Sequence, residues 1–248
     1  SGTLVDSIIF GPQVADLSIG RTGGEEESWR LNLPTPGEPN QPHSLGNPAG
    51  LRINEWMSKP EVVYTQDFVE LHNADALPVS VGGMRITDAP LDPARGAVLP
   101  AMSFVGGGGF LVLEAVGNSA NGPSELPFKL SASHGWLAIY GSNLVEIDRV
   151  HTSCDIPDQS QGRVTDGDDL YARFPVPTPG LPNATDLSAE YGILRSLRIT
   201  EIMYHPAELS DAEFIEVRNV GPEPINLAGV EFTKGVRFAF PDMTLAPG

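Results

Sequence analysis

The chain has 248 residues, a length that suits one or two domains of ordinary size. Its 27 glycines and 23 prolines favour many turns and short strands over long helices. The formal net charge of −17 disfavours binding to nucleic-acid phosphates and to anionic lipid surfaces. No apolar run approaches the roughly 20 residues that span a membrane, so we expect no nucleic-acid partner and no membrane insertion.

Short apolar stretches rich in Val, Ile, Leu and Phe alternate with turn residues along the chain, a pattern that predicts strands. We expect strands at residues 51–57, 68–73, 79–81, 84–87, 110–113, 137–140, 144–150 and 171–174. Gly82-Gly83 and residues 141–143 are typical of tight turns, and the second should close a hairpin. Helix signals are weak, with a single turn at most over 210–213. This number of short strands predicts an all-β fold, an immunoglobulin-like sandwich.

The chain repeats parts of itself. Three blocks from its middle recur 146 positions later without a gap, and two other blocks recur at offsets of 142 and 143. The matching pairs are 51–57 with 197–203, 68–73 with 214–219, 78–81 with 224–227, 16–21 with 158–163 (D-x-S-x-G-R), and 34–40 with 177–183 (P-T-P-G-x-P-N). Agreement over several blocks indicates tandem modules.

The phase of the repeat predicts where the modules begin and end. Residues 51–183 form a complete module, 1–40 match the C-terminal half of a preceding module, and 197–248 match the N-terminal half of a following one. Residues 41–50 and 184–196 are then linkers. Because the two end segments are complementary parts of one module, we expect them to join either within one chain or between chains. Association between chains would be head to tail.

The repeated blocks resemble the bacterial lamin-tail domain. The resemblance is carried by I-x-E-[WI]-M at 53–57 and 199–203, F-[VI]-E-[LV]-x-N at 68–73 and 214–219, P-[VI]-x-[VL]-x-G at 78–83 and 224–229, the expected hairpin over 137–150, and the closing run from D-x-S-x-G-R to P-T-P-G-x-P-N. It covers nearly the whole chain. It implies an immunoglobulin-like β-sandwich, found in exported multidomain proteins beside hydrolases, nucleases or CotH-like kinase domains, and it implies little chemistry.

Two carboxylates recur with the repeat, Glu55 with Glu70 and then Glu201 with Glu216. A paired-carboxylate interpretation makes them a general acid and base. The competing interpretation gives each pair a structural role, bonding backbone or basic groups of its own module. We favour the structural role, because identical catalytic pairs in tandem modules would be unusual.

The D-x-S-x-G-R block predicts a turn held by the Asp158 and Ser160 side chains, with Arg163 covering or pairing nearby. Asp16 and Arg21 occupy the same places in the earlier copy. The block lacks the pattern of a nucleophile elbow, so we expect no catalytic serine there.

The densest acidic run is 165–169, and Asp166, Asp168 and Asp169 are the candidate calcium ligands. The run partly resembles a D-x-D-G calcium loop but lacks the later Glu and the spacing of an EF-hand. The five histidines show no metal-binding spacing, and the single cysteine, Cys154, excludes a cysteine framework or a structural zinc site. We expect no cofactor other than calcium as a candidate.

These observations predict a non-catalytic structural or adhesive repeat module of a secreted or cell-surface protein, located outside the cell, whose partners are other domains of the parent protein or further copies of itself. The alternative is an accessory module that binds a glycan or a protein and targets an enzyme domain outside this chain. The aromatic side chains that would form a sugar-stacking platform are Trp29, Trp56, Trp136, Tyr64, Tyr140, Tyr171 and Tyr204.

Overall fold

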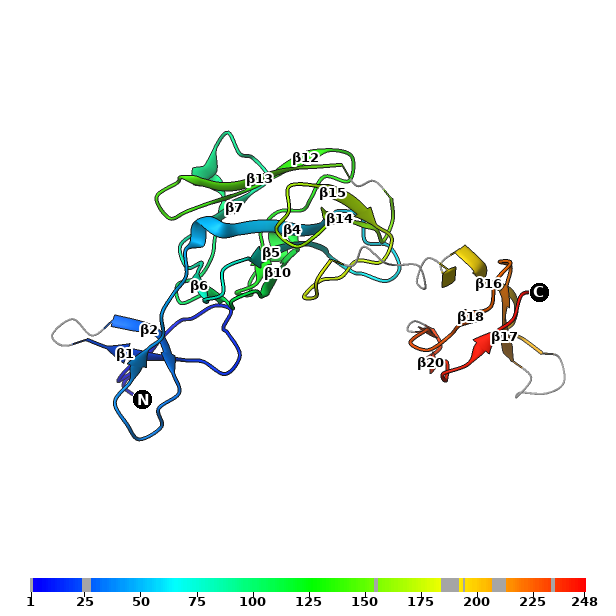
Figure 1. The fold of residues 1–248 in the computed structure, drawn as a ribbon, viewed down its shortest axis with the longest axis horizontal. Helices are drawn as coiled ribbons and strands as arrows, with labels where there is room; N and C mark the ends of the chain where they lie inside the picture. The colour runs from blue at the N-terminus through cyan, green and yellow to red at the C-terminus, as the bar shows by residue number, and fades with distance from the viewer. Residues whose placement is uncertain are drawn as a thin grey trace. The chain divides into compact units, whose positions relative to one another are not determined.

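The computed structural model describes residues 2–23, 28–153, 156–183, 192–193, 195–206, 213–232 and 235–248. The described chain is all-β, as predicted, and its helical segments are short, among them the 3₁₀ turns η1 (Pro48–Gly50), η2 (Pro93–Arg95) and η3 (Gly117–Ser119) (Figure 1). It divides into two compact units, Ser1–Thr185 and Asp186–Gly248. None of the described helices is long and apolar enough to cross a membrane.

The larger sheet of the first unit has six strands in the order β11-β10-β5-β4-β14-β15. All neighbours in it are antiparallel except β10 and β11, which are parallel. Its strands are β4 (Leu51–Met57), β5 (Asp67–Asn73), β10 (Phe110–Ala115), β11 (Glu125–Leu126), β14 (Ser160–Arg163) and β15 (Tyr171–Phe174). Figure 1 shows β4, β5 and β10 running side by side.

A second sheet has the order β13-β12-β7-β8, and β6 (Val79–Ser80) pairs separately with β9 (Phe104–Val105). Its strands are β7 (Arg85–Thr87), β8 (Ala97–Val98), β12 (Gly135–Tyr140) and β13 (Glu146–Thr152). The predicted hairpin is confirmed, since β12 and β13 are antiparallel and Gly141 N donates to Val145 O at 2.9 Å.

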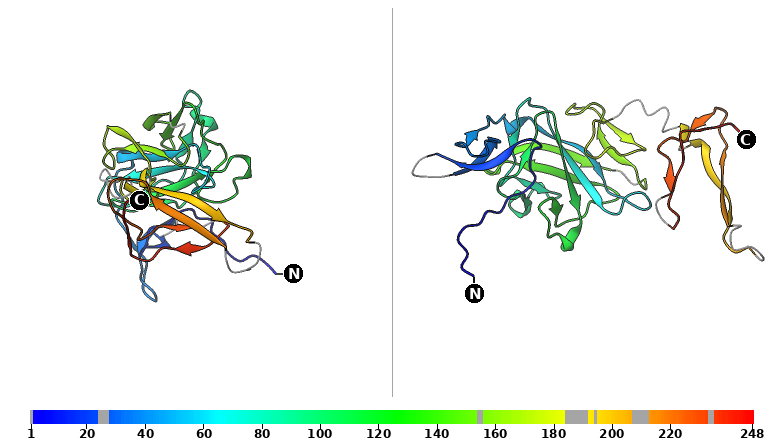
Figure 2. Two further views of the ribbon diagram at one scale, coloured as in Figure 1. Left: turned by 90° about the vertical axis from the view of Figure 1, so that its right-hand side faces the viewer. Right: turned by 90° about the horizontal axis from the view of Figure 1, so that it is seen from below.

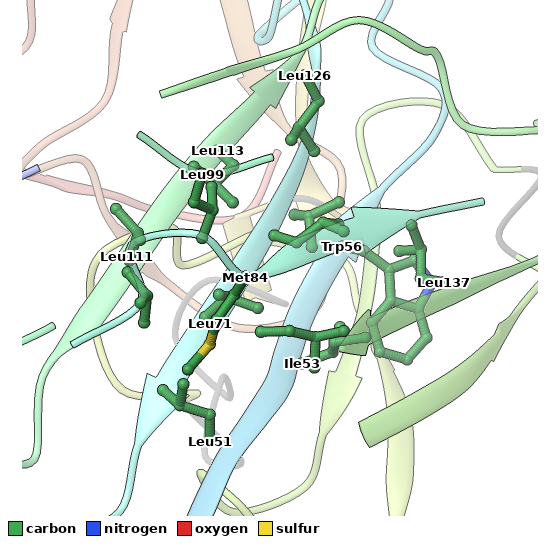
Figure 3. Packing of buried hydrophobic residues seen from close by; sticks show 14 of the residues in the cluster. Leu51, Ile53, Trp56, Leu71, Met84, Leu99, Leu111, Leu113, Leu126 and Leu137 are labelled. Carbon is green, nitrogen blue, oxygen red and sulfur yellow. The ribbon is translucent and has the colours of Figure 1, made fainter. Parts of the chain in front are cut away.

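Side chains of both sheets form one hydrophobic cluster (Figure 3). Ile53, Trp56 and Leu71 enter it from the six-stranded sheet, whereas Ile86 and Leu137 enter it from the four-stranded sheet, and each is at most 1% exposed. Full burial of one such side chain stabilises the fold by about 1.5–3 kcal/mol. The cluster therefore holds the two sheets together.

The first 50 residues belong to the first unit and form a small sheet, β1 (Ser18–Thr22), β2 (Ser28–Leu33) and β3 (Gln41–Pro42). Phe104 N donates to Pro12 O at 2.9 Å, which fixes the N-terminal segment to the strand β9. Gly46 N donates to Pro78 O at 2.8 Å. The predicted linker 41–50 is thus bonded to the residues just before β6.

The second unit consists of paired short strands. The longest pair is the antiparallel hairpin β16–β17, seen in gold and orange in Figure 2. β18 pairs with β21, and β19 pairs with β20. The strands are β16 (Leu197–Met203), β17 (Phe214–Asn219), β18 (Ile225–Asn226), β19 (Glu231–Phe232), β20 (Phe238–Ala239) and β21 (Thr244–Leu245). A turn was expected at 210–213, but residues 210–212 lie outside the described residues.

Candidate functional site

A β-bulge in β4 creates the most site-like cluster of the first unit. The register between β4 and β5 shifts between Ile53 and Glu55, so Asn54 is the extra residue and Glu55 lies opposite Glu70. Asn54 Nδ2 donates to Glu70 Oε1 at 3.0 Å. The bulge therefore places the two glutamates directly across the hairpin from each other, and neither is exposed.

The closing segment (residues 177–183) covers this pair. Thr178 N donates to both carboxylate oxygens of Glu55, at 3.0 and 3.1 Å, and Gly180 N donates to Glu70 Oε2 at 2.6 Å. The Ser160 hydroxyl of β14 also donates to Glu55. Gly180 has φ +84°, a conformation that favours glycine and turns the segment so that its N–H groups face the carboxylates.

Burial dominates the electrostatics of the pair. It raises the pKa of Glu55 above its ordinary value, against the hydrogen bonds from Ser160 and Thr178, and it raises the pKa of Glu70 to about 7. In the part of the chain that the structure describes, neither glutamate forms an ion pair. The prediction that the pair bonds backbone groups is confirmed for Glu55 and Glu70, and the bonds tie the closing segment to β4 and β5.

Arg163 anchors β14 beside this cluster. Its side chain is 1% exposed, Nε donates to Ile53 O at 2.8 Å, and Nη2 lies 2.8 Å from Asp148 Oδ2. The guanidinium also lies 5.0 Å from the centre of the Tyr171 ring and donates to the backbone carbonyl of Asp168. Sequence analysis predicted that Arg163 would pair nearby, without identifying its partner on β13.

The prediction of a turn across D-x-S-x-G-R is wrong for the last four of its six residues. Ser160–Arg163 forms β14, an inner strand between β4 and β15. Only Asp158 has a turn role: its φ is 51°, and its carboxylate accepts N–H groups of Glu61 and Val62 at 2.9 and 2.8 Å. Burial alone would raise the pKa of Asp158, but the backbone N–H groups outweigh it and leave that pKa below its ordinary value.

The three candidate calcium ligands have separate protein contacts. Asp166 Oδ1 accepts Asn54 Nδ2 and Asn183 N, both at 2.9 Å. Asp168 Oδ1 accepts Asp169 N at 2.6 Å, and the fully exposed Asp169 carboxylate lies 3.7 Å from Arg163 Nη1. No group of three or more His, Cys, Asp or Glu arranged to hold a metal was found among the described residues. Calcium stays a prediction, and the absence of heat in a calorimetric titration at millimolar calcium would exclude it.

The aromatic side chains are distributed between core and surface. Trp56 is buried, with its ring centre 5.9 Å from that of Tyr171. Trp136 is 47% exposed on β12, where the His151 ring lies 5.1 Å away and the Arg149 guanidinium 5.9 Å away. Trp56 is therefore a core residue, and Trp136 is the exposed aromatic of the hairpin. Cys154 lies outside the described residues.

The N-terminal segment repeats the bonding of β14 and β15. The hairpin β1–β2 has the cross-strand register of β14–β15, 142 positions earlier. Arg21 Nη2 lies 2.8 Å from Asp6 Oδ1, as Arg163 Nη2 lies 2.8 Å from Asp148 Oδ2. Arg21 also lies 5.1 Å from the centre of its cross-strand neighbour, the Trp29 ring.

The second unit repeats the strand pairing of β4 and β5 in the first unit. The hairpin β16–β17 has the register of β4–β5, with its bulge at Thr200 where β4 has Asn54. Both bulge side chains donate to the glutamate across the hairpin, Thr200 Oγ1 to Glu216 and Asn54 Nδ2 to Glu70. The pairs β18–β21 and β19–β20 correspond in order to β6–β9 and β7–β8.

Comparison of the chain with models of known protein families, with curated proteins and with solved structures gave no match.

Proposed function

We propose that this chain is a non-catalytic structural or adhesive segment of a secreted or cell-surface protein, built from tandem immunoglobulin-like modules of the lamin-tail type. The observation that carries the proposal is the repeated register. The hairpins β4–β5 and β16–β17 share a bulge at the same position, and β1–β2 shares its register with β14–β15. Repeats that keep the same strand pairing are typical of arrays of stacked or linked modules.

The bonding of the buried carboxylates supports a structural role. Glu55 and Glu70 accept hydrogen bonds from the closing segment, from β14 and from Asn54, so their oxygens are engaged by the fold. A general acid or base instead needs access to a substrate proton. The acidic surface of the chain, with a net charge of −17, is consistent with a soluble exported protein.

A substrate screen tests the absence of catalysis. We expect no turnover of ester, glycoside, phosphoester or nucleic-acid substrates by the purified chain. Glu55→Gln is the matched variant, because it keeps the size of the side chain and removes its ionisation. Turnover that is lost in Glu55→Gln while the circular dichroism spectrum is unchanged would overturn the proposal.

The alternative function, a glycan-binding accessory module, is favoured by one observation. Trp136 is 47% exposed and is flanked by His151 and Arg149, an aromatic face with polar neighbours. A glycan array probes it directly. Binding that Trp136→Ala abolishes and Trp29→Ala leaves intact would favour the accessory module over the structural segment.

A further inference from the structure

The N-terminal sheet (β1–β3) is attached to the two-sheet region that follows it (residues 51–183) at two places besides the covalent chain. At the first place, Gly11 N donates to Ala101 O at 3.2 Å, and Phe104 N donates to Pro12 O at 2.9 Å. Each of the two segments thus both donates and accepts. These bonds hold residues 11–12 against the chain that leads into β9.

The second attachment is made by residues just before β4. Gly46 N donates to Pro78 O at 2.8 Å, and Asn47 N donates to Asp75 Oδ2 at 3.0 Å. The other oxygen of this carboxylate accepts Leu77 N at 3.0 Å. Because the two attachments lie on different loops, together they restrain rotation about the connecting chain, which the chain alone would permit.

The segment that makes the first attachment follows a repeated path. Asp6 Oδ1 lies 2.8 Å from Arg21 Nη2, and Asp148 Oδ2 lies 2.8 Å from Arg163 Nη2. The aspartate precedes the arginine by 15 residues in both copies. The chain before β1 therefore takes the place that β13 takes before β14, and the first attachment lies at the connection between those two elements.

Gly11 is buried at this attachment, and the space around it admits no side chain. A Cβ atom on Gly11 would lie 2.0 Å from Ser103 Oγ, and 3.1 and 3.2 Å from the Cβ atoms of Pro100 and Ser103. Ser103 is fully buried, and its hydroxyl donates to Pro100 O at 2.7 Å. The contact therefore requires glycine, whereas the aligned residue 142 positions later is Ser153.

The second attachment also lacks a counterpart in the later copy. At the offset of 146, Asp75 aligns with Gly221 and Asn47 aligns with Ile193, so the later copy has no carboxylate at the position that accepts the backbone N–H. Gly46 approaches Asp75 closely, because a Cβ atom on Gly46 would lie 2.6 Å from Asp75 Cγ. Both attachments thus depend on residues that the repeat does not keep.

We propose that residues 75–78 and 100–104 form a docking surface for the neighbour that precedes the two-sheet region, and that Gly11 and Asp75 make this surface selective. A neighbour that carries Ser153 in the place of Gly11 does not fit, because its Cβ atom would meet Ser103. The contacts, as well as the chain, then determine which repeats lie next to each other. The inference rests on the proposed function, because it treats the N-terminal sheet and the two-sheet region as successive modules.

Distances between two spin labels measure how firmly the neighbours are held. In a Cys154→Ser background, which removes the only native thiol, the labels are attached at Ser28→Cys on β2 and Glu114→Cys on β10, two exposed positions. We expect one narrow distance distribution for the native junction. If residues 41–50 were a free flexible linker, its ends would vary over roughly 15–20 Å.

Variants of the two attachments should widen this distribution. We expect Gly11→Ala with Asp75→Ala to broaden it about 2-fold or more, and each single variant to broaden it less. Gly50→Ala is the matched control, because a Cβ atom on Gly50 meets nothing within 4 Å. Ser103→Ala should restore a narrow distribution to Gly11→Ala, because it removes the Oγ atom that the new Cβ atom would meet.

Hydrogen exchange reports on each attachment separately. The Phe104 amide belongs to the first and the Gly46 amide to the second. In Gly11→Ala we expect the Phe104 amide to exchange about 10-fold faster and the Gly46 amide to keep its rate. Unchanged exchange of the β4 amides verifies that the two-sheet region remains folded.

Two results would overturn the docking surface. One is a native distance distribution as broad as that of the double variant, and the other is equal widths for Gly11→Ala and Gly50→Ala. Either failure leaves the structural role standing. Turnover of a substrate by the purified chain would instead remove the structural role and leave the label distances unchanged.

Discussion

The buried Arg163 and the partly exposed Asp148 form an ion pair between two different sheets, with 2.8 Å between Nη2 and Oδ2. Asp148 Oδ2 also accepts Ile53 N at 2.7 Å, and Arg163 Nε donates to Ile53 O at 2.8 Å. The pair therefore satisfies both backbone groups of the residue that precedes the bulge. It connects β13 to the edge of β4 at the point where the ladder is interrupted.

We predict that Asp148→Ala destabilises the first unit by about 3 kcal/mol, because it leaves the buried Arg163 charge with only the fully exposed Asp169 carboxylate, 3.7 Å away, as an ionic partner. All three tryptophans lie in the first unit, so tryptophan fluorescence in urea reports its unfolding. Arg95→Gln is the control, since it breaks the exposed pair with Asp92 and should cost no more than about 0.5 kcal/mol. Equal losses in the two variants would contradict the prediction.

Stability should depend on the ionisation of Glu70. Its pKa is about 7 in the fold against an ordinary value of 4.5, so the folded state holds the proton more tightly. This contribution is complete below about pH 4.5 and is lost as the pH rises through 7. We predict that the free energy of unfolding decreases by roughly 2–3 kcal/mol between pH 5 and pH 8 on account of this residue.

Urea unfolding of Glu70→Gln over the same pH range checks this dependence. The variant should lose most of the decrease, because its side chain cannot ionise. Glu114→Gln, which removes an exposed carboxylate from the neighbouring strand β10, should keep it. A Glu70→Gln profile parallel to that of the native chain would show that another group is responsible.

Hydrogen exchange should separate the two copies of the hairpin. β4–β5 and β16–β17 share their register, but Ile53 is fully buried and Ile199 is 53% exposed. Exchange depends on local opening, and few buried contacts oppose the opening of β16. At a concentration of 1 μM, we predict that β4 amides exchange at least about 100-fold more slowly than the aligned β16 amides. Similar rates would mean that β16 is covered in solution.

Gly162 of β14 lies opposite Glu55, beside the bulge at Asn54. A Cβ atom at this position would lie 2.6 Å from Asn54 O, a backbone atom that cannot move away cheaply. We predict that Gly162→Ala destabilises the first unit by about 1–3 kcal/mol in the same fluorescence experiment. Gly50→Ala is the control, because a Cβ atom at Gly50 meets nothing within 4 Å and should change stability by less than about 0.5 kcal/mol.

Local patterning predicted much of the fold. The run at 51–57 is strongly apolar and forms β4 with the same bounds, and the turn at 141–143 forms the expected hairpin. β14 was missed because Ser160–Arg163 has little β propensity: its place depends on the close approach of Gly162 to Asn54. That approach is a tertiary contact, which no local pattern contains.

The candidate site was predicted only in part. The repetition of Glu55 and Glu70 indicated a shared structural role. The repeated P-T-P-G block was a signal for Thr178 and Gly180, but sequence analysis used it only as evidence of repeats and of the family resemblance. The bulge at Asn54 was hidden, because a shift in register leaves no mark in the sequence of one strand. The family resemblance and the calcium ligands remain predictions.

The repeats also show where chain length can vary. Ile86 pairs with Ala97, eleven positions later, whereas in the second unit Phe232 pairs with Phe238, only six positions later. The spacing across the bulged hairpins, by contrast, is the same in both copies. An engineer who wishes to display a foreign peptide on this scaffold should therefore insert it between β7 and β8, and should leave the number of residues between Leu51 and Asn73 unchanged.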